Sequence, residues 1–426
     1  MTIQEIYKFY SPEAGVSTDT RAIKAGQLFF ALKGDNFNGN KFAKQAIESG
    51  AKYAIIDEEE YLSENCILVE DALAALQALA GYHRQQLDVP VIGLTGSNGK
   101  TTSKELVAAA LSNGFKVGYT QGNLNNHIGV PLTLLNLPVD AEIIVVEMGA
   151  NAQKEIEFLS SISMPDIGFI TNYGKAHLEG FGGPEGVIKG KSELFMNLRL
   201  HNKMAWVNIV DPIQIEKSEG IRQKTYGNKP EADFPVFPVV SSSAFVSVAF
   251  NGVEINSNLT GSYNFSNLAI AVSLASHFGL DANAIKKGIE AYQPSNNRSQ
   301  LEKGLNNLLV KDYYNANPSS MEAALGNFEG LEEKSPEDKW VILGDMFEMG
   351  DYEAEEHQKV ADLALSQGYE KCILVGKAFS KTEGDALKFE STEALLEFLK
   401  LNLPENKLIL VKGSRGMRLE RAADLL

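Results

Sequence analysis

Residues 91–102 constrain the fold of this chain more than any other stretch of its sequence. They read Val-Ile-Gly-Leu-Thr-Gly-Ser-Asn-Gly-Lys-Thr-Thr, which predicts an apolar strand, a glycine-rich turn and a helix from about Lys100 to Leu111. Backbone N–H groups of such a turn converge, and the helix N-terminus adds partial positive charge, so the stretch favours phosphate binding over an unliganded turn. Lys100 would reach the outer phosphates of a nucleotide, and the Thr101 hydroxyl would bind Mg²⁺. The pattern is incomplete, because Leu94 stands where its first glycine is usual.

The length of the chain limits the number of domains that we expect, and its charge limits the kinds of partner. A chain of 426 residues predicts two or three domains at ~150 residues each. The formal net charge is 39 minus 55, or −16, which argues against a nucleic-acid partner because such a partner requires a basic face. A local nest of N–H groups with one lysine can still bind a phosphorylated small molecule.

The sequence shows no sign of an oxidising or membrane environment. Cys66 and Cys372 lie far apart and read as idle thiols of a reducing compartment. The N-terminus lacks a basic segment followed by an apolar run, and no apolar run reaches membrane-spanning length. We therefore expect a cytoplasmic protein without stable membrane insertion.

Residues 1–85 form the first of three expected units. Strand patterns at 28–32 and 51–56 precede a helix that begins after Asp71 and carries its apolar residues on one stripe. A polar loop in this unit reads, on the residues alone, as a solvated turn: Thr18, Asp19 and Arg21.

The second unit, residues 86–296, carries polar residues at the ends of two further strands. The strand at 142–147 ends in Glu147, where a metal-binding acid is expected because ligands bind at the carboxyl ends of parallel strands. The strand at 167–172 leads into a glycine-rich loop with His177, although a lone loop histidine more often packs than binds. The amide-rich loop at 120–131 is either simple turn chemistry or a surface for a polar ligand.

Three more patterns complete this unit. A helix at 185–197 carries Lys189 and Lys191, and the default expectation for both is a solvated face. Asn251-Gly252 between two strand patterns predicts a hairpin. A later helix opens near Asn264, and Asn267 lies one turn further on the same face.

The third unit, residues 297–426, alternates strands and helices, which predicts a parallel sheet covered by helices. Strands are expected at 307–312, 340–344, 372–376 and 408–412, and helices at 319–328, 353–367 and 392–401. Asp312, Asp345 and Ser414 then stand at strand exits. From the residues alone, ATPase, kinase, ligase and nucleotide switch all remain open.

Six motifs spread over essentially the whole chain resemble those of the Mur ligase family, the ATP-dependent amide ligases of peptidoglycan precursor synthesis. They lie at residues 95–102, 147–151, 172–178, 189–193, 261–267 and 312–318. Residues 122–131, 314–318 and 343–350 further resemble the members that add D-alanyl-D-alanine, and the Asp-Asn-Pro-Arg motif of the ligase for the third residue is absent from the sequence. Tyr263 and residues 38–40 depart from the usual pattern.

The resemblance implies a three-domain α/β fold. It consists of a small α/β N-terminal domain (1–85) that binds the UDP substrate, a central ATP-binding domain (86–296) and a C-terminal Rossmann-like α/β domain (297–426). The central domain is a parallel sheet of the phosphate-loop ATPase type with added β-hairpins, and the C-terminal domain closes on ATP and binds the dipeptide.

The resemblance also implies residue roles. The catalytic set is Lys100, Lys191, His177 and Glu147, and the metal set, for two Mg²⁺ ions, is Thr101, Glu147, His177 and a carbamylated Lys191. ATP would contact Thr95, Gly96, Ser97, Asn98, Gly99, Lys100, Thr101, Thr102, Asn264, Asn267, Arg298 and Asp312. Substrates would contact Thr18, Asp19, Arg21, Asn123, Asn125, Asn126, Asn315 and Asn317.

The implied activity joins D-alanyl-D-alanine to a UDP-N-acetylmuramoyl-tripeptide through an acyl phosphate, in a monomeric enzyme. One alternative is another ligase of the superfamily, such as a folylpolyglutamate synthase. A second is a non-catalytic nucleotide-binding scaffold.

Overall fold

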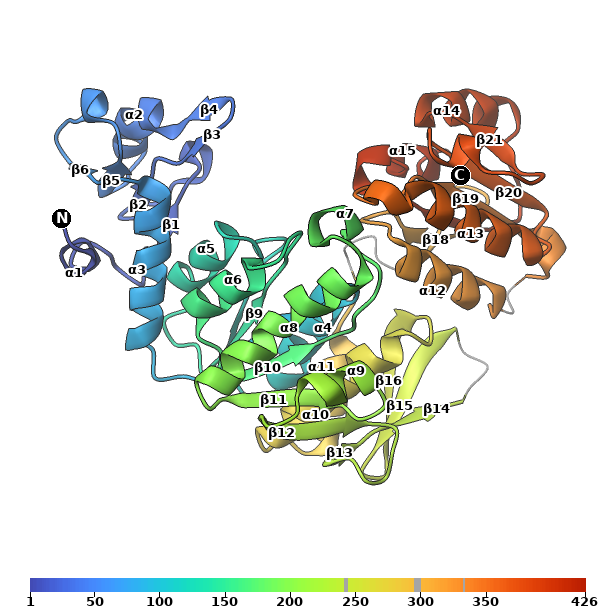
Figure 1. Cartoon of the computed structure of the whole chain (residues 1–426), viewed down its shortest axis with the longest axis horizontal. Helices are drawn as coiled ribbons and strands as arrows, with labels where there is room; N and C mark the ends of the chain where they lie inside the picture. Colours follow the sequence, from blue (N-terminus) through green and yellow to red (C-terminus); the bar gives the residue numbers. More distant parts are fainter. Residues whose placement is uncertain (241–243, 295–299, 332–333) are drawn as a thin grey trace.

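The computed structural model describes residues 1–240, 244–294, 300–331 and 334–426, arranged as three α/β units in series (Figure 1). The N-terminal and C-terminal units stand on opposite sides of the central one. The predicted boundary between residues 296 and 297 lies outside the described residues, and the predicted domain limits stay predictions. Within the described ranges, no helix has both the length and the apolar character needed to cross a bilayer.

The N-terminal unit is built on a small parallel sheet in the order β1-β2-β5-β6. Its elements are α1 (Ile3–Tyr7), β1 (Val16–Ser17), β2 (Leu28–Phe30), β3 (Lys33–Gly34), β4 (Phe37–Asn38), α2 (Ala43–Glu48), β5 (Tyr53–Ile56), β6 (Cys66–Leu68) and α3 (Ala72–Gln86). The strands expected at 28–32 and 51–56 are present in shortened form. The Asp71 side chain accepts a hydrogen bond from the Ala74 N–H and caps α3 as predicted.

Helix α3 fastens this unit to the central sheet. Arg84, near its C-terminal end, is buried and donates to the carboxylate of Asp166 at 2.8 Å and the carbonyl of Met164 at 3.0 Å. Asp166 directly precedes a central strand, so the helix is tied to the framework that carries the phosphate loop.

Buried His83 makes the stability of this junction depend on pH. Its Nδ1 lies 3.0 Å from the Tyr7 hydroxyl, and burial lowers the pKa of the imidazole below its ordinary value of 6.5. Because the unfolded chain then binds the proton more readily, we expect α1 and α3 to lose stability as the pH falls below about 6.5. Hydrogen exchange of their amides at about pH 7.5 and 5.5 measures this loss. The substitution His83→Gln should flatten the pH dependence, whereas His277→Gln in the central unit should leave it unchanged, and an unaltered slope in His83→Gln would contradict the prediction.

The central unit is a fully parallel sheet in the order β13-β12-β11-β10-β7-β9-β8. Its strands are β7 (Val91–Thr95), β8 (Val117–Tyr119), β9 (Ile143–Glu147), β10 (Ile167–Ile170), β11 (Met204–Asn208), β12 (Arg222–Gly227) and β13 (Phe234–Pro235). Its helices are α4 (Lys100–Leu111), α5 (Gly129–Leu135), α6 (Glu155–Ser163), α7 (Leu178–Phe181), α8 (Pro184–Leu200), α9 (Pro212–Lys217), α10 (Asn264–His277) and α11 (Ala282–Ala291).

Alternation along β9 shows how the sheet is covered on both faces. Ile143 and Val145 pack in one apolar cluster with residues of α4, α10 and α11, whereas Ile144 and Val146 pack in another with residues of α5, α6 and α8. Successive side chains of a strand point to opposite faces, so a strand this apolar requires helices on both. The polar end of β9, Glu147, is left at the edge where the strands end.

A small antiparallel sheet adds to this unit in the order β14 (Phe237–Val239), β15 (Phe245–Phe250) and β16 (Val253–Thr260). Asn251 and Gly252 join β15 to β16 with positive φ at both residues, which confirms the predicted hairpin.

The C-terminal unit is a sheet in the order β17-β18-β22-β19-β20-β21, parallel except for β17. Its elements are β17 (Gln300–Lys303), β18 (Leu308–Asp312), α12 (Pro318–Glu329), β19 (Lys339–Gly344), α13 (Glu353–Ser366), β20 (Lys371–Val375), β21 (Leu387–Phe389), α14 (Thr392–Leu401), β22 (Leu408–Lys412) and α15 (Glu420–Ala423). All seven predicted elements of this unit are confirmed, whereas the edge strands β17 and β21 were not anticipated.

Candidate active site

The predicted phosphate loop connects β7 to α4, and two of its glycines are required by close contacts. Gly96 has φ +145° and Gly99 has φ +78°. A Cβ atom at Gly96 would lie 2.0 Å from the Thr171 hydroxyl, and one at Gly99 would lie 2.6 Å from the side-chain oxygen of Asn267. The loop can therefore take this path only with glycine at both positions.

The end of β10 anchors the loop. The N–H groups of Ser97 and Asn98 donate to the carbonyl and side-chain oxygens of Asn172, both at 3.1 Å. Thr171 donates its hydroxyl proton to the Asn98 carbonyl at 2.6 Å. Lys100 lies over the loop, and its Nζ donates to the Gly96 carbonyl at 2.7 Å. The loop is thus held in shape by its neighbours, with the Lys100 ammonium at its mouth.

Glu147 lies beside the loop, as its place at the end of β9 predicts. The carboxylate is 1% exposed, and its Oε1 accepts from the Thr101 hydroxyl at 3.2 Å and from the Asn125 amide at 2.7 Å. Its Oε2 has no hydrogen-bond partner among the described residues, and the Lys104 ammonium lies 3.7 Å away. A buried carboxylate oxygen next to a threonine hydroxyl fits the donor set for Mg²⁺, which binds few protein ligands and takes others from phosphate and water.

The contact between Asn125 and Glu147 predicts a positioning effect. The substitution Asn125→Ala should raise the Mg²⁺ concentration that gives half-maximal ATP turnover by about 10-fold. Without the Asn125 amide, the Glu147 carboxylate is held less firmly and must be ordered when the metal binds. A Mg²⁺ titration of phosphate release measures this. Gln121→Ala, an exposed side chain in the same loop, is the matched control. Equal metal dependence in Asn125→Ala and the wild type would count against the effect.

Lys191 differs from the solvated side chain expected by default. It is fully buried on α8, whereas Lys189 is exposed. Its Nζ donates to the Ala150 carbonyl at 3.0 Å and lies 4.8 Å from the centre of the Phe181 ring. Burial, together with the nearby Lys100 charge, holds the pKa of this amine well below its ordinary value. The default expectation was wrong here because α8 is covered by α6 and α7.

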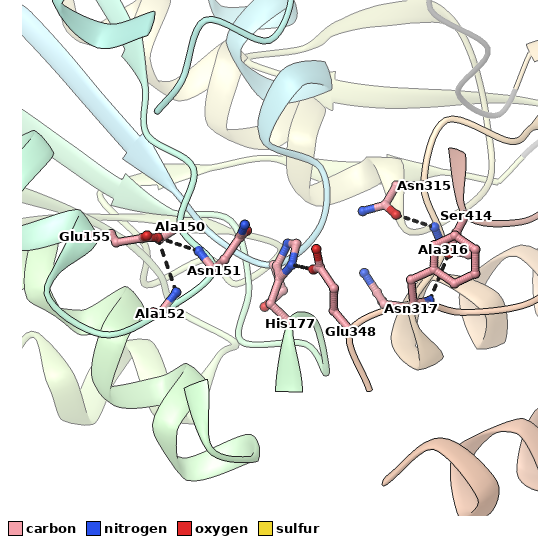
Figure 2. A network of polar contacts seen from close by, with 12 residues as sticks. Ala150, Asn151, Ala152, Glu155, His177, Asn315, Ala316, Asn317, Glu348 and Ser414 are labelled. Atoms are coloured by element: carbon pink, nitrogen blue, oxygen red, sulfur yellow. Dashed lines mark hydrogen bonds and ion pairs between the residues drawn. The ribbon is translucent and has the colours of Figure 1, made fainter. Parts of the chain in front are cut away.

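Glu193, two residues after Lys191, has a structural role that the sequence did not indicate. Its two carboxylate oxygens accept from the N–H groups of Lys154 and Glu157, at 2.6 and 3.0 Å. It therefore caps the N-terminus of α6 from another helix. Glu155 likewise accepts from the N–H groups of Asn151 and Ala152 (Figure 2). These contacts fix the strand-to-helix loop that carries the carbonyl bound by Lys191.

His177 lies at the junction with the C-terminal unit. Figure 2 shows its ring and the Glu348 carboxylate pointing toward one another, and the two side chains form a short ion-pair contact. Burial lowers the pKa of the His177 ring, against the opposing effect of Glu348. Lys175, two residues earlier, pairs with buried Glu356 of α13 at 2.7 Å. His177 was predicted as a metal ligand, and that role stays a prediction.

The phosphate loop also touches the C-terminal unit directly. The side-chain amide of Asn317 donates to the Asn98 oxygen at 2.7 Å, and the Asn317 oxygen accepts from the Ser320 N–H to cap α12. Ser319 accepts from the Lys175 N–H at 2.8 Å. The C-terminal unit thus docks on the loops that follow β7 and β10.

These loops enclose a cavity of about 1250 Å³. The predicted site residues that line it are Ser97, Asn98, Gly99, Lys100, Thr101, Thr102, Asn123, Asn125, Asn126, Glu147, His177, Asn264, Asn267, Asp312, Asn315 and Asn317. Buried Thr95 and Lys191, and Gly96, do not line the cavity but lie beside residues that do. Arg298 falls outside the described residues.

Thr18, Asp19 and Arg21 do not belong to this cavity. They lie in the N-terminal unit, where the Arg21 guanidinium pairs with the exposed Asp19 carboxylate at 2.7 Å and holds the pKa of that carboxyl at about 2. Strand β1, which directly precedes this loop, lies in a different unit from α4, at whose start the phosphate loop ends (Figure 1).

Sequence reasoning missed several residues of the cavity. Lys412 is buried at the end of β22, and its Nζ lies 2.6 Å from the Asp312 carboxylate at the end of neighbouring β18. Its position at the end of a predicted strand was the available signal. In the described parts of the chain, no group of three or more His, Cys, Asp and Glu side chains is arranged to hold a metal. A metal beside Glu147 would therefore take its other ligands from hydroxyl, phosphate or water oxygens.

Comparisons with known proteins agree along the chain. Three family profiles match it, described as Mur ligase family, catalytic domain (residues 14–93), Mur ligase middle domain (94–275) and Mur ligase, glutamate ligase domain (297–415). The UDP-N-acetylmuramoyl-tripeptide–D-alanyl-D-alanine ligase of Bacillus subtilis is 35% identical, with 95% of this chain and 91% of that protein covered. The Escherichia coli protein of the same name is also 35% identical, with 96% and 93% covered.

A crystal structure of a similar protein agrees with the sequence comparisons. MurF from Acinetobacter baumannii superposes with a TM-score of 0.84 at 31% identity, over 96% of this chain and 92% of that one. The three-domain α/β fold predicted from the sequence is therefore confirmed. With profiles matching from residue 14 to residue 415 and relatives similar over nearly its whole length, this chain belongs to the Mur ligase family.

Proposed function

We propose that this chain is an ATP-dependent ligase that joins D-alanyl-D-alanine to a UDP-N-acetylmuramoyl-tripeptide in peptidoglycan precursor synthesis. The observation that carries the proposal is the shared cavity, in which the phosphate loop and Glu147 of the central unit face Asn315 and Asn317 of the C-terminal unit. Relatives similar over nearly the whole chain bear the name of this activity.

The reaction proceeds in two steps. The terminal carboxylate of the tripeptide attacks the γ-phosphorus of ATP, ADP leaves, and an acyl phosphate forms. The amine of the dipeptide then attacks the acyl carbon, and the tetrahedral intermediate loses phosphate and a proton to give the amide. Charge builds on the transferring phosphoryl oxygens in the first step, and the loop N–H groups and Lys100 are placed to stabilise it.

Each of the three units has its own role in binding the substrates. The N-terminal unit binds the UDP moiety with the loop of Thr18, Asp19 and Arg21, and the central unit binds ATP with Asn264 and Asn267 near the base. Arg298 and Asp312 belong to the part of the C-terminal unit that closes over the nucleotide. Closure excludes water, which would otherwise hydrolyse the acyl phosphate.

Two Mg²⁺ ions fit this proposal. Thr101 and Glu147 would hold one, and His177 with a modified Lys191 the other, where they would neutralise phosphate charge. The modification is a carbamate. A neutral Lys191 amine attacks CO₂, an N–C bond forms and one proton is released, so that a buried neutral amine becomes an anion. The lowered pKa of Lys191 supports this role, because only the unprotonated amine is a nucleophile.

One assay tests the function. Phosphate release from ATP should require both a UDP-muramoyl tripeptide and D-alanyl-D-alanine, and the product should gain the mass of the dipeptide. Turnover with a folate and glutamate instead would support the alternative ligase, and tight ADP binding without acceptor-dependent turnover would support the scaffold. Tripeptides ending in diaminopimelate and in lysine, compared in parallel, would identify the natural third residue. The monomeric state and the cytoplasmic location stay predictions from the sequence.

A further inference from the structure

Arg415 is an exposed residue of the C-terminal unit whose side chain contacts a residue of the cavity lining. It follows β22 in the loop Gly413–Met417, and the residues after the two neighbouring strands, β18 and β19, include Tyr314 and Phe347. Ligands of open parallel sheets bind at this edge, where the strands end. Three adjacent loops thus place a guanidinium, a phenol ring and a phenyl ring at the edge of the sheet where a ligand is expected.

The contacts of Arg415 aim it at the cavity wall. Its guanidinium carbon lies 5.4 Å from the centre of the ring of Tyr314, which lines the cavity. A Cβ atom at the next residue, Gly416, would lie 2.5 Å from the Phe347 ring, so this ring packs on the same loop. Phe347 is 46% exposed. A cation and a small apolar surface therefore stand side by side.

The charge of Arg415 has no carboxylate partner in the described parts of the chain. The side chain is exposed and makes no ion pair with a carboxylate of the described residues. Lys412, the other cation at the end of β22, is buried and paired with Asp312. Unlike Lys412, Arg415 is therefore available to an anionic ligand group at this edge of the cavity.

We propose that Arg415 binds the terminal carboxylate of the acceptor dipeptide, an inference that rests on the proposed function. An acceptor must point its amine at the acyl phosphate in the cavity and its carboxylate away from it. Two extended residues separate these ends by about 7 Å. The guanidinium fork matches a carboxylate with two hydrogen bonds, and the ring of Phe347 offers a surface for the alanyl methyl groups. Arg415 would thus select a dipeptide acid over acceptors that lack the anion.

The test compares KM values for D-alanyl-D-alanine at saturating ATP and UDP-muramoyl tripeptide. Arg415→Ala should raise the KM for the dipeptide about 10- to 100-fold, with kcat and the KM values for the other two substrates changed by less than about twofold. Arg418→Ala is the matched control, since Arg418 is an exposed arginine of the same segment with no ring contact to a cavity residue. Arg415→Lys should recover part of the loss.

A neutral acceptor supplies a readout that misfolding would not produce. For the wild type, the KM for the C-terminal amide of D-alanyl-D-alanine should exceed the KM for the acid by the same factor of about 10 to 100. In Arg415→Ala the two KM values should be nearly equal. An unchanged dipeptide KM, a preserved preference for the acid, or a raised KM for ATP in Arg415→Ala would overturn the inference. Failure of the proposed function would look different, because the wild type itself would then show no dipeptide-dependent phosphate release.

Discussion

Replacing Lys100 with alanine is expected to lower dipeptide-dependent phosphate release by about 100- to 1000-fold. The Lys100 ammonium lies at the mouth of the phosphate loop, within 2.7 Å of the Gly96 carbonyl, and lines the cavity. A preorganised cation at a site of developing negative charge stabilises the transition state more than the ground state, so kcat should fall more than the affinity for ATP.

Steady-state kinetics and nucleotide binding by calorimetry separate these two effects. Lys116→Ala is the control, because that lysine is largely exposed and paired with Asp140 on the surface. The thermal unfolding of Lys100→Ala should stay close to that of the wild type. If this variant kept a tenth or more of the wild-type rate, the loop would not be the site of phosphoryl transfer.

Replacing Lys191 with alanine is expected to lower the rate at least about 10- to 100-fold, and a small added carboxylate such as acetate should restore part of it. The reason is the position of the amine, which is buried and close to the Ala150 carbonyl, and whose pKa burial holds well below its ordinary value. Its carbamate would be an anion that can bind Mg²⁺, which an unmodified lysine side chain cannot do.

Two measurements check this expectation. Growth with ¹³C-bicarbonate should give a carbamate signal in the wild type that Lys191→Ala lacks. Lys189→Ala, on the exposed side of the same helix, should keep both the signal and the rate. Absence of the signal from active wild-type enzyme would remove the carbamate from the scheme, even if the Lys191 variant were slow.

Local patterns predicted most of the fold. The phosphate loop, the Asp71 cap and the Asn251-Gly252 hairpin each follow from a few neighbouring residues, because turn and cap chemistry is local. The edge strands β17 and β21 escaped prediction since each is short and carries charged residues. An edge strand needs pairing on one side only, so it leaves a weak apolar signal.

The site was predicted less evenly. Glu147 could be placed from the end of its strand, but the burial of Lys191 depends on the packing of α8 against other helices. Periodicity cannot show which face of a helix is covered by a distant segment. His177 pairs with Glu348, and Arg415 stacks on Tyr314. In both pairs the partners are more than a hundred positions apart in the sequence. Such contacts follow from tertiary structure alone.

The hydrogen bond from Asn317 to Asn98 has a thermodynamic consequence. One partner is in the loop expected to surround the nucleotide, and the other caps the first helix of the C-terminal unit. If ATP shifts the loop, the two side chains must either move together or separate, so nucleotide affinity and the placement of that unit share one coupling free energy. Reciprocity then requires that a substitution which frees the unit, such as Asn317→Ala, alter the dissociation constant for ATP by the same factor by which ATP alters the docking equilibrium.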